Sequence, residues 1–167
     1  MTDPSLLTAL LHNTWANLEL FRFCAGLTAE QLEWTGPGTY GSIHATLQHI
    51  VGAEQGYLFT LTGGELPPAG ALPAEGLASL DDLRSRAATN GERVERILGG
   101  DFDATKHFKL RRGGTAAGGI VVGQYLHHGS DHRAHIGTIL GAHGVAGPNC
   151  DVWAFGSSTG EVTPNPR

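Results

Sequence analysis

The chain has 167 residues, of which 40% are hydrophobic and 16% charged, and its formal net charge is −5 at pH 7. This length fits a single domain over residues 1–167 with a core of ordinary size. The acidic balance and the lack of a long Lys/Arg run argue against nucleic acid and membranes as partners. No stretch reaches the roughly 18–20 apolar residues of a membrane span. With only Cys24 and Cys150 and no signal-peptide pattern, a cytoplasmic protein is expected.

The first half of the chain predicts two long helices and one short helical turn. Residues 4–25 are expected to be helical because Pro4 suits the first position and leucines follow the 3.6-residue period. The segment Thr28-Ala-Glu-Gln31 has the pattern of a capping box and predicts a short turn of helix. Ser42 is expected to cap a second long helix over 43–61, which the glycine pair that follows ends.

The second half predicts a crossover, two more long helices and a tail. Residues 65–76 contain three prolines and are expected to form a long irregular crossover. Long helices are predicted over 79–98 and 120–141, with a short hairpin within 106–114. The tail, residues 147–167, is expected to be irregular and to pack on the body. Four long amphipathic helices with one long crossover predict an all-α four-helix bundle.

Two histidines stand one helical turn apart in the last long helix. His128 and His132 lie about 40° apart around the helix axis. They share the stripe of Val121 and Tyr125, so both are expected to point toward the core. Two imidazoles in this arrangement can hold one divalent metal ion. The alternative is a pair of core histidines that are hydrogen-bonded to backbone or to a carboxylate.

The best candidate for a third ligand is His49, at the border of the apolar stripe of the second long helix. Small residues one and two turns further on leave space there for a ligand or for close helix approach: Gly52, Ala53 and Gly56. His135 shares the face of His132 and is a candidate third ligand from the same helix, a residue that supports the ligands, or a polar residue at the edge of the stripe.

Glu54 lands near the centre of the apolar stripe of the second long helix. A carboxylate in that place must be paired, hydrogen-bonded or neutral. It is a candidate to orient a ligating imidazole or to act as a base. The alternative is a structural pairing with Arg22, Arg133 or a tyrosine.

Several segments along the chain resemble the DinB-like superfamily of four-helix bundles, which includes bacillithiol- and mycothiol-dependent transferases and mycothiol-dependent maleylpyruvate isomerase. The similarity covers nearly the whole chain. Its most specific part is the spacing of two histidines followed by arginine. The segments that carry it are Trp15-Ala-Asn17, Tyr40-Gly-Ser-Ile43, Leu47-Gln-His-Ile50 followed by Glu54, His128-Gly-Ser-Asp-His-Arg133-Ala-His-Ile136, and Asp151-Val-Trp153.

The resemblance implies a three-histidine site made by His49, His128 and His132, with a divalent transition metal (zinc, nickel or iron) at the open end of the bundle. It also implies a low-molecular-weight thiol as co-substrate and a homodimer. The chain departs from many relatives at His135, where they have Gln. Candidate walls of the substrate pocket are Trp34, Tyr40, residues 67–73 and Trp153.

Three imidazole ligands would leave at least one coordination position open, as in catalytic rather than structural zinc sites. We therefore expect a metal-dependent enzyme that acts on a small molecule, either a thiol-dependent S-transferase or a hydrolase. Two alternatives remain. The chain is a non-catalytic metal-binding or stress-response protein, or it is a helical interaction scaffold in which the histidines only pack.

Overall fold

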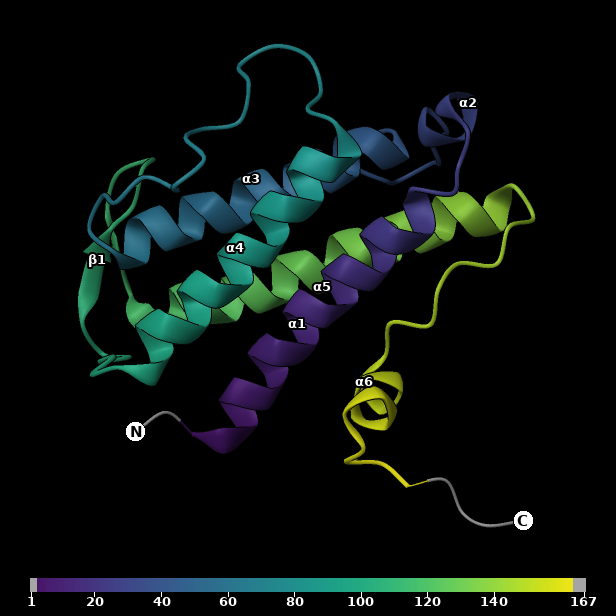
Figure 1. The fold of residues 1–167 in the computed structure, drawn as a ribbon. Coiled ribbons are helices and arrows are strands. Elements are labelled where there is room, and N and C mark those ends of the chain that lie inside the picture. Colours follow the sequence, from purple (N-terminus) through teal and green to yellow (C-terminus); the bar gives the residue numbers. More distant parts are fainter. Residues whose placement is uncertain (1–2, 164–167) are drawn as a thin grey trace.

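All four long helices predicted from the sequence are present in the computed structural model, which describes residues 3–163 (Figure 1). The first three are capped as expected, since the side chains of Asp3, Ser42 and Ser79 each accept a hydrogen bond from the first helical turn, whereas the last begins after Ala117 without a side-chain cap. The long helices are α1 (Pro4–Cys24), α3 (Ile43–Leu61), α4 (Leu80–Gly99) and α5 (Gly118–Ala142).

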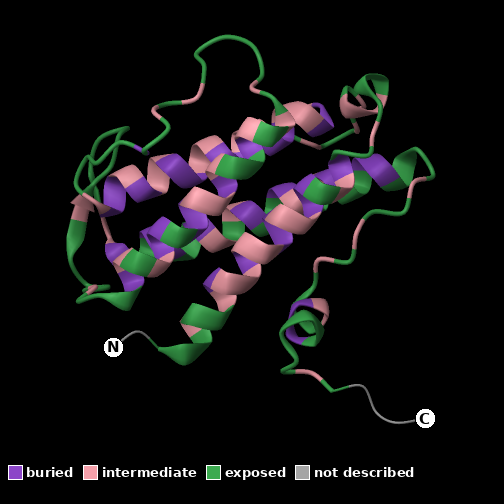
Figure 2. Cartoon of the chain, viewed as in Figure 1, coloured by how far each residue is buried: buried purple, intermediate pink, exposed green. Residues whose placement is uncertain are grey.

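Each long helix packs on two others, so the four form a closed bundle. Both α1 and α3 contact α4 and α5. The buried residues lie on the faces that the helices turn toward one another (Figure 2). They form two clusters along the bundle, one around Phe21, Leu47 and Ile136 and the other around Leu58 and Tyr125. The prediction of an all-α four-helix bundle is confirmed.

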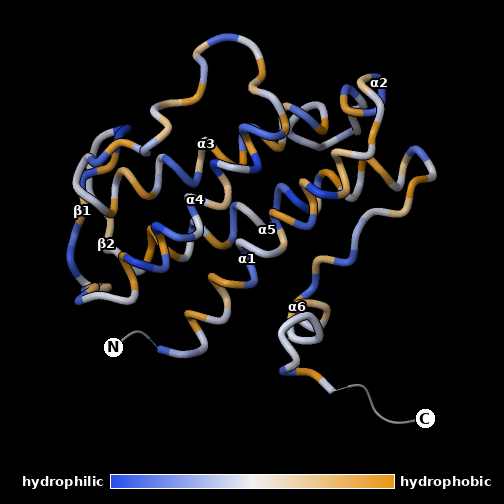
Figure 3. The backbone as a smooth tube through the Cα atoms, in the orientation of Figure 1, coloured by the Kyte–Doolittle hydropathy of each residue, from blue (hydrophilic) through white to orange (hydrophobic). Residues whose placement is uncertain are grey.

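Helix α4 has the most one-sided distribution of hydrophobic residues among the long helices. Hydrophilic and hydrophobic residues alternate along it in the tube view (Figure 3). Its apolar residues Leu83, Val94 and Leu98 are fully buried, whereas most of its charged residues face solvent. This helix closes the bundle on the side of α1 and α3 by hydrophobic burial along a single stripe.

The long crossover joins α3 to α4, and side chains of both helices form hydrogen bonds with its backbone. Gln48 accepts from the Ala78 amide (2.7 Å), and a ring nitrogen of His44 lies 2.8 Å from the Ala78 carbonyl oxygen. Arg86 of α4 donates to the Gly70 carbonyl (2.8 Å). The crossover arches over one side of the bundle (Figure 1), as the three prolines predict.

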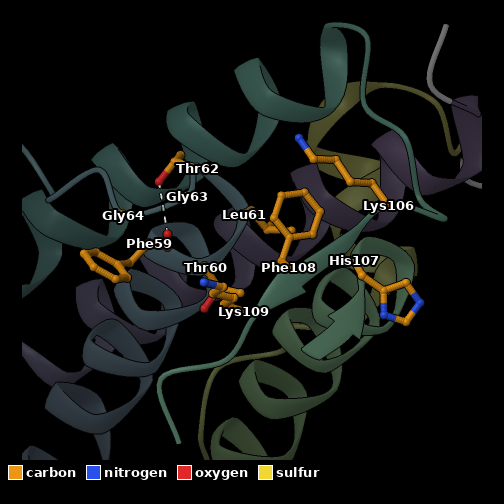
Figure 4. A pocket seen from close by; sticks show the side chains of 10 residues that line it. All are labelled: Phe59, Thr60, Leu61, Thr62, Gly63, Gly64, Lys106, His107, Phe108 and Lys109. Atoms are coloured by element: carbon orange, nitrogen blue, oxygen red, sulfur yellow. Dashed lines mark hydrogen bonds between the residues drawn. The ribbon is translucent and has the colours of Figure 1, made fainter. Parts of the chain in front are cut away.

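The predicted short elements are also present, although the second strand of the hairpin follows the predicted range of 106–114. The capping box opens α2 (Ala29–Leu32), and an antiparallel hairpin is formed by β1 (His107–Lys109) and β2 (Thr115–Ala117). The hairpin lies against the C-terminal end of α3, where Phe108 packs near Leu61 beside a cavity of about 340 Å³ (Figure 4). This contact anchors the stem of the hairpin to the bundle.

The tail differs from the sequence prediction, because it contains a short helix, α6 (Val152–Thr159). The Asp151 side chain caps it by accepting from the Ala154 amide (2.7 Å), and Gly160 ends it with a positive φ of 78°. Helix α6 contacts α1, where Phe155 packs on Trp15. The last four residues of the predicted tail, 164–167, lie outside the described residues.

None of the described helices combines the length and the apolar character that a membrane crossing needs.

Candidate metal centre

The structure brings His49 of α3 together with His128 and His132 of α5. Each offers one ring nitrogen, and these three atoms lie within 4.8 Å of one another. The Nε2 atoms of His49 and His128 are 3.0 Å apart. Two nitrogens bonded to one zinc ion at about 2.0–2.1 Å lie roughly 3 Å apart when the angle between the bonds is near 90°. The three imidazoles are thus close enough together to form a candidate site for one divalent ion.

The hydrogen bonds of these rings do not match those of ordinary core histidines. The Nδ1 atoms of His128 and His132 are buried and have no hydrogen-bond partner among residues 3–163. The hydrogen-bond contact of the His128 Nε2 atom is with another imidazole, that of His49. The alternative of two core histidines satisfied by backbone or carboxylate lacks support here, since neither ring has such a partner. A cation that accepts the ring lone pairs would explain why they converge.

The three rings are held in the neutral form that binds metals. Burial, followed by the neighbouring charges of His132 and His49, lowers the pKa of His128 to about 4. Burial and His132 lower the pKa of His49, while burial and His135 lower that of His132. A neutral imidazole offers a free lone pair at neutral pH, so no proton has to be displaced before the metal binds.

Tyr40, in the loop before α3, covers the site from the solvent side. Its ring is stacked on His49 with 3.8 Å between centroids, and it meets His132 edge-on at 5.3 Å. Tyr40 is 53% exposed. It thus lies against the histidines, but it does not line the cavity of about 440 Å³ that adjoins them, so its predicted role as a pocket wall stays a prediction. The other two aromatic candidates lie elsewhere, because Trp34 is stacked on His143 and Trp153 is 74% exposed.

A cavity of about 440 Å³ adjoins the histidines along α3. His49 and His128 line it together with the small residues of α3 and the tip of the hairpin. Its volume lies within the range of about 300–1,000 Å³ that is usual for small-molecule sites. The arrangement therefore joins a candidate metal centre to a space large enough for a small substrate.

The model of the DinB family matches residues 1–165. The chain belongs to the DinB family. Its fold is similar to the crystal structure of a DinB-like protein from Bacillus cereus ATCC 10987, with a TM-score of 0.69 and 16% sequence identity over 89% of this chain and 97% of that one. At this identity the likeness shows a shared fold. No curated protein matches the chain.

His135 belongs to a second group of potential ligands in this DinB-family protein. Asp131, His132 and His135 also bring one ligand atom each within 4.8 Å, and His135 Nε2 lies 3.8 Å from the Asp131 carboxylate. His132 is common to both groups, so an ion in either one uses this ring. The Asp131 side chain is 51% exposed, so the second group is more accessible to solvent than the first.

Glu54 is directed away from the imidazoles toward three asparagines. It is 1% exposed and accepts hydrogen bonds from Asn13 (3.1 Å), Asn17 (2.8 Å) and Asn90 (3.2 Å). Burial raises the pKa of Glu54 to about 7, against the lowering effect of these bonds and of Arg133. Among the described residues, its hydrogen bonds link α3 to α1 and α4 and do not reach a histidine.

Arg133, next to the candidate ligand His132, completes this network. Its Nη1 atom donates to the side-chain oxygens of Asn13 (2.8 Å) and Asn17 (2.7 Å). The two asparagines thus bridge the partly buried guanidinium and the Glu54 carboxylate. The sequence pointed to Arg133 as a partner of Glu54 but not to the asparagines, although their four-residue spacing on α1 puts them on one face.

Gly129, which follows the candidate ligand His128, is where α5 comes close to α1. A Cβ atom there would lie 2.5 Å from the Asn13 side-chain oxygen and 2.9 Å from Arg133 Nη1. Only glycine leaves this space free. The network of Glu54, Asn13, Asn17 and Arg133 is therefore packed directly beneath the helical turn that carries the candidate ligands His128 and His132.

Proposed function

We propose that this protein is a metal-dependent enzyme that acts on a small molecule through an open three-histidine site. The observation that carries the proposal is the convergence of the His49, His128 and His132 nitrogens at the edge of a cavity of about 440 Å³. Imidazole ligands suit zinc, nickel and iron, and one of these is the proposed metal.

Three neutral ligands favour catalysis over a purely structural role. Structural zinc sites use four protein ligands, whereas catalytic ones keep a position for water or substrate. A bound divalent ion would polarise a carbonyl, lower the pKa of a bound water, or bind a thiolate. The ligand set brings no negative charge to that ion, so its full charge would act on the substrate.

The residues of the chain position and shield this site. Neutral His49, His128 and His132 would hold the ion on two helices that pack together. Tyr40 fixes the ring plane of His49 from outside. The Glu54 network keeps α5 in register with α1 and α3, so the ligand turn has little freedom. Such rigid support is what an open site needs to keep its geometry during a reaction.

Within this proposal, the favoured reaction is S-transfer from a low-molecular-weight thiol to an electrophilic small molecule, with hydrolysis as the second candidate. Thiol transfer is supported by the sequence resemblance described above, and hydrolysis by the general chemistry of open histidine-bound zinc. The homodimer implied by the resemblance remains a prediction.

The test is a reaction screen with protein reconstituted separately with zinc, nickel and ferrous iron. We expect one metal form to turn over a thiol–electrophile pair or an ester or amide. A chelator should abolish the activity, and His128→Ala should lack it while keeping its helical circular dichroism. Metal binding without turnover across both panels would contradict the enzyme proposal and favour a metal-binding protein without catalysis.

A further inference from the structure

The cavity beside the histidines has a second chemically distinct end. His49 and His128 line one end, and Leu110, Arg111 and Arg112 at the hairpin tip line the other. These two groups are far apart in the sequence, and the bundle brings them to one space. The small-residue face of α3 lies between them, where Gly52 and Gly56 line the cavity without a side chain.

Arg111 reaches over this face of α3. A Cβ atom at Gly56 would lie 4.0 Å from Arg111 Nη1, so the guanidinium lies above α3 two turns beyond His49. Seven residues correspond to about 10 Å along the helix axis. Arg111 also lines the neighbouring cavity under the crossover, with Leu66 and Leu72. It therefore stands between the histidine site and the crossover.

The hairpin that carries the arginines is tied to the bundle at its stem. Phe108 packs with the core cluster near Leu61. At the tip, Leu110 and Gly114 are joined by a backbone hydrogen bond of 3.0 Å. Strand β2 ends at Ala117 and α5 begins at the next residue. The helix that carries His128 and His132 thus continues directly from the hairpin, which places the arginines relative to the ligands.

The charges of the two arginines are uncompensated. Within residues 3–163, neither Arg111 nor Arg112 forms an ion pair, and neither side chain is engaged in a hydrogen bond. Both are exposed at the cavity, in a chain whose net charge is −5. A guanidinium stays charged at any physiological pH and matches carboxylate and phosphate oxygens with two parallel hydrogen bonds.

We propose that Arg111 and Arg112 bind an oxyanion of the substrate, a carboxylate or a phosphate, while the reacting group lies at the histidine site. This inference rests on the proposed function and names its substrate class: small molecules whose anionic group is separated from the reacting atom by a spacer of several bonds. A neutral or cationic end at the arginines would lose these contacts or be repelled.

The test uses the cobalt(II) form, whose visible spectrum reports on ligands of the metal. Succinate, adipate and suberate are titrated in, with hexanoate and aminohexanoate as counterparts that lack the second anion. Phosphonobutyrate distinguishes phosphate-type from carboxylate binding. We expect at least one doubly anionic probe to bind about tenfold or more tightly than hexanoate, because charge-assisted hydrogen bonds strengthen binding by that order. Aminohexanoate should bind more weakly than hexanoate.

The double variant Arg111→Gln/Arg112→Gln should lose the advantage of the doubly anionic probe but keep the cobalt stoichiometry. The matched control is Arg84→Gln/Arg96→Gln, which removes the same charge from exposed positions on α4 and should behave as the wild type. Equal affinity of the probe for the wild type and the hairpin variant would overturn the inference and leave the metal site intact. Failure of the wild type to bind cobalt would overturn the proposed function, and the inference with it.

Discussion

The ring of Tyr40 is stacked on the imidazole of His49, with 12° between the ring planes and 3.8 Å between the centroids. His49 is the one candidate ligand that α3 supplies, whereas the other two share α5. The stacked ring of Tyr40 therefore fixes the plane of the His49 imidazole. In this plane the Nε2 atom of His49 faces His128.

Replacing Tyr40 by Ala should weaken metal binding without unfolding the protein. Aromatic pairs contribute about 0.5–1.5 kcal/mol beyond their burial, so the dissociation constant of the metal should rise up to about tenfold. Tyr40→Phe keeps the ring and should bind like the wild type. Competition with a chromogenic chelator measures all three proteins. If Tyr40→Phe binds as weakly as Tyr40→Ala, the hydroxyl rather than the stacked ring supports the site.

Gly129 should be far less tolerant of a methyl group than another glycine of the same helix. Gly129→Ala presses against Asn13 and Arg133 and should lower the free energy of unfolding by about 1–3 kcal/mol. Gly137 also lies in α5 and is exposed, and a methyl group there would meet open space among the described residues. Gly137→Ala should raise the same free energy by about 0.5–1 kcal/mol. Urea unfolding compares the two, and equal effects would rule out the close approach at Gly129.

The helices and the His128–His132 pair could be predicted because each follows from the 3.6-residue helical repeat within one continuous stretch of sequence. The sequence made His49 the best candidate for the third ligand, but it could not show that its side chain faces the other two histidines. The packing of α3 on α5 decides that direction. The helix in the tail was missed because Gly, Pro, Ser and Thr dominate the composition, although Asp151 before an apolar run is a cap signal. The hydrogen-bond partners of a single buried polar residue are harder still to predict from the sequence.

The partners of Glu54 show this limit most clearly. A buried carboxylate in an apolar stripe signals that some partner exists. Its hydrogen bonds, however, come from α1 and α4, and the nearby guanidinium comes from α5. Such a network depends on how four helices pack together, and no local sequence pattern predicts that Asn90 donates a hydrogen bond to Glu54. The position of the hairpin tip beside α3 could likewise not be predicted from the sequence, because a surface turn with two arginines is common and does not indicate which helix it contacts.

Glu54→Gln should change how stability depends on pH. The pKa of Glu54 is raised to about 7 by burial, from an ordinary value of 4.5. The folded state therefore binds this proton more tightly than the unfolded state, and the resulting stabilisation is lost as the pH rises from about 4.5 through about 7. Relative to Glu54→Gln, the wild type should lose on the order of 1–3 kcal/mol between about pH 5 and pH 8.

Unfolding in urea at a series of pH values provides the check on Glu54. The histidines of the site have lowered pKa values, so they destabilise the fold as the pH falls below about 6.5, the opposite direction. Because both proteins contain these histidines, their effect cancels in the comparison. A difference between the proteins that stays constant with pH would show that Glu54 ionises as freely as in the unfolded chain.

Removal of His135 separates the two groups of potential ligands. His135→Ala destroys the group with Asp131 but leaves His49, His128 and His132 in place. We expect this variant to keep its full metal content, with a dissociation constant within a few fold of the wild type, because the remaining group has three neutral imidazoles. Loss of the metal from His135→Ala would indicate that the ion is bound by the group of Asp131, His132 and His135 instead.

The most direct test of the three-histidine site is elemental analysis of untagged protein prepared without chelators. Wild type is compared with His49→Ala, His128→Ala and the control His127→Ala, which removes an exposed histidine of the same helix. We predict about one transition-metal ion per chain in the wild type and the control, and none in the other two variants with unchanged helical content. A wild type without metal, or a His49→Ala protein that keeps its full metal content, would contradict the three-histidine site.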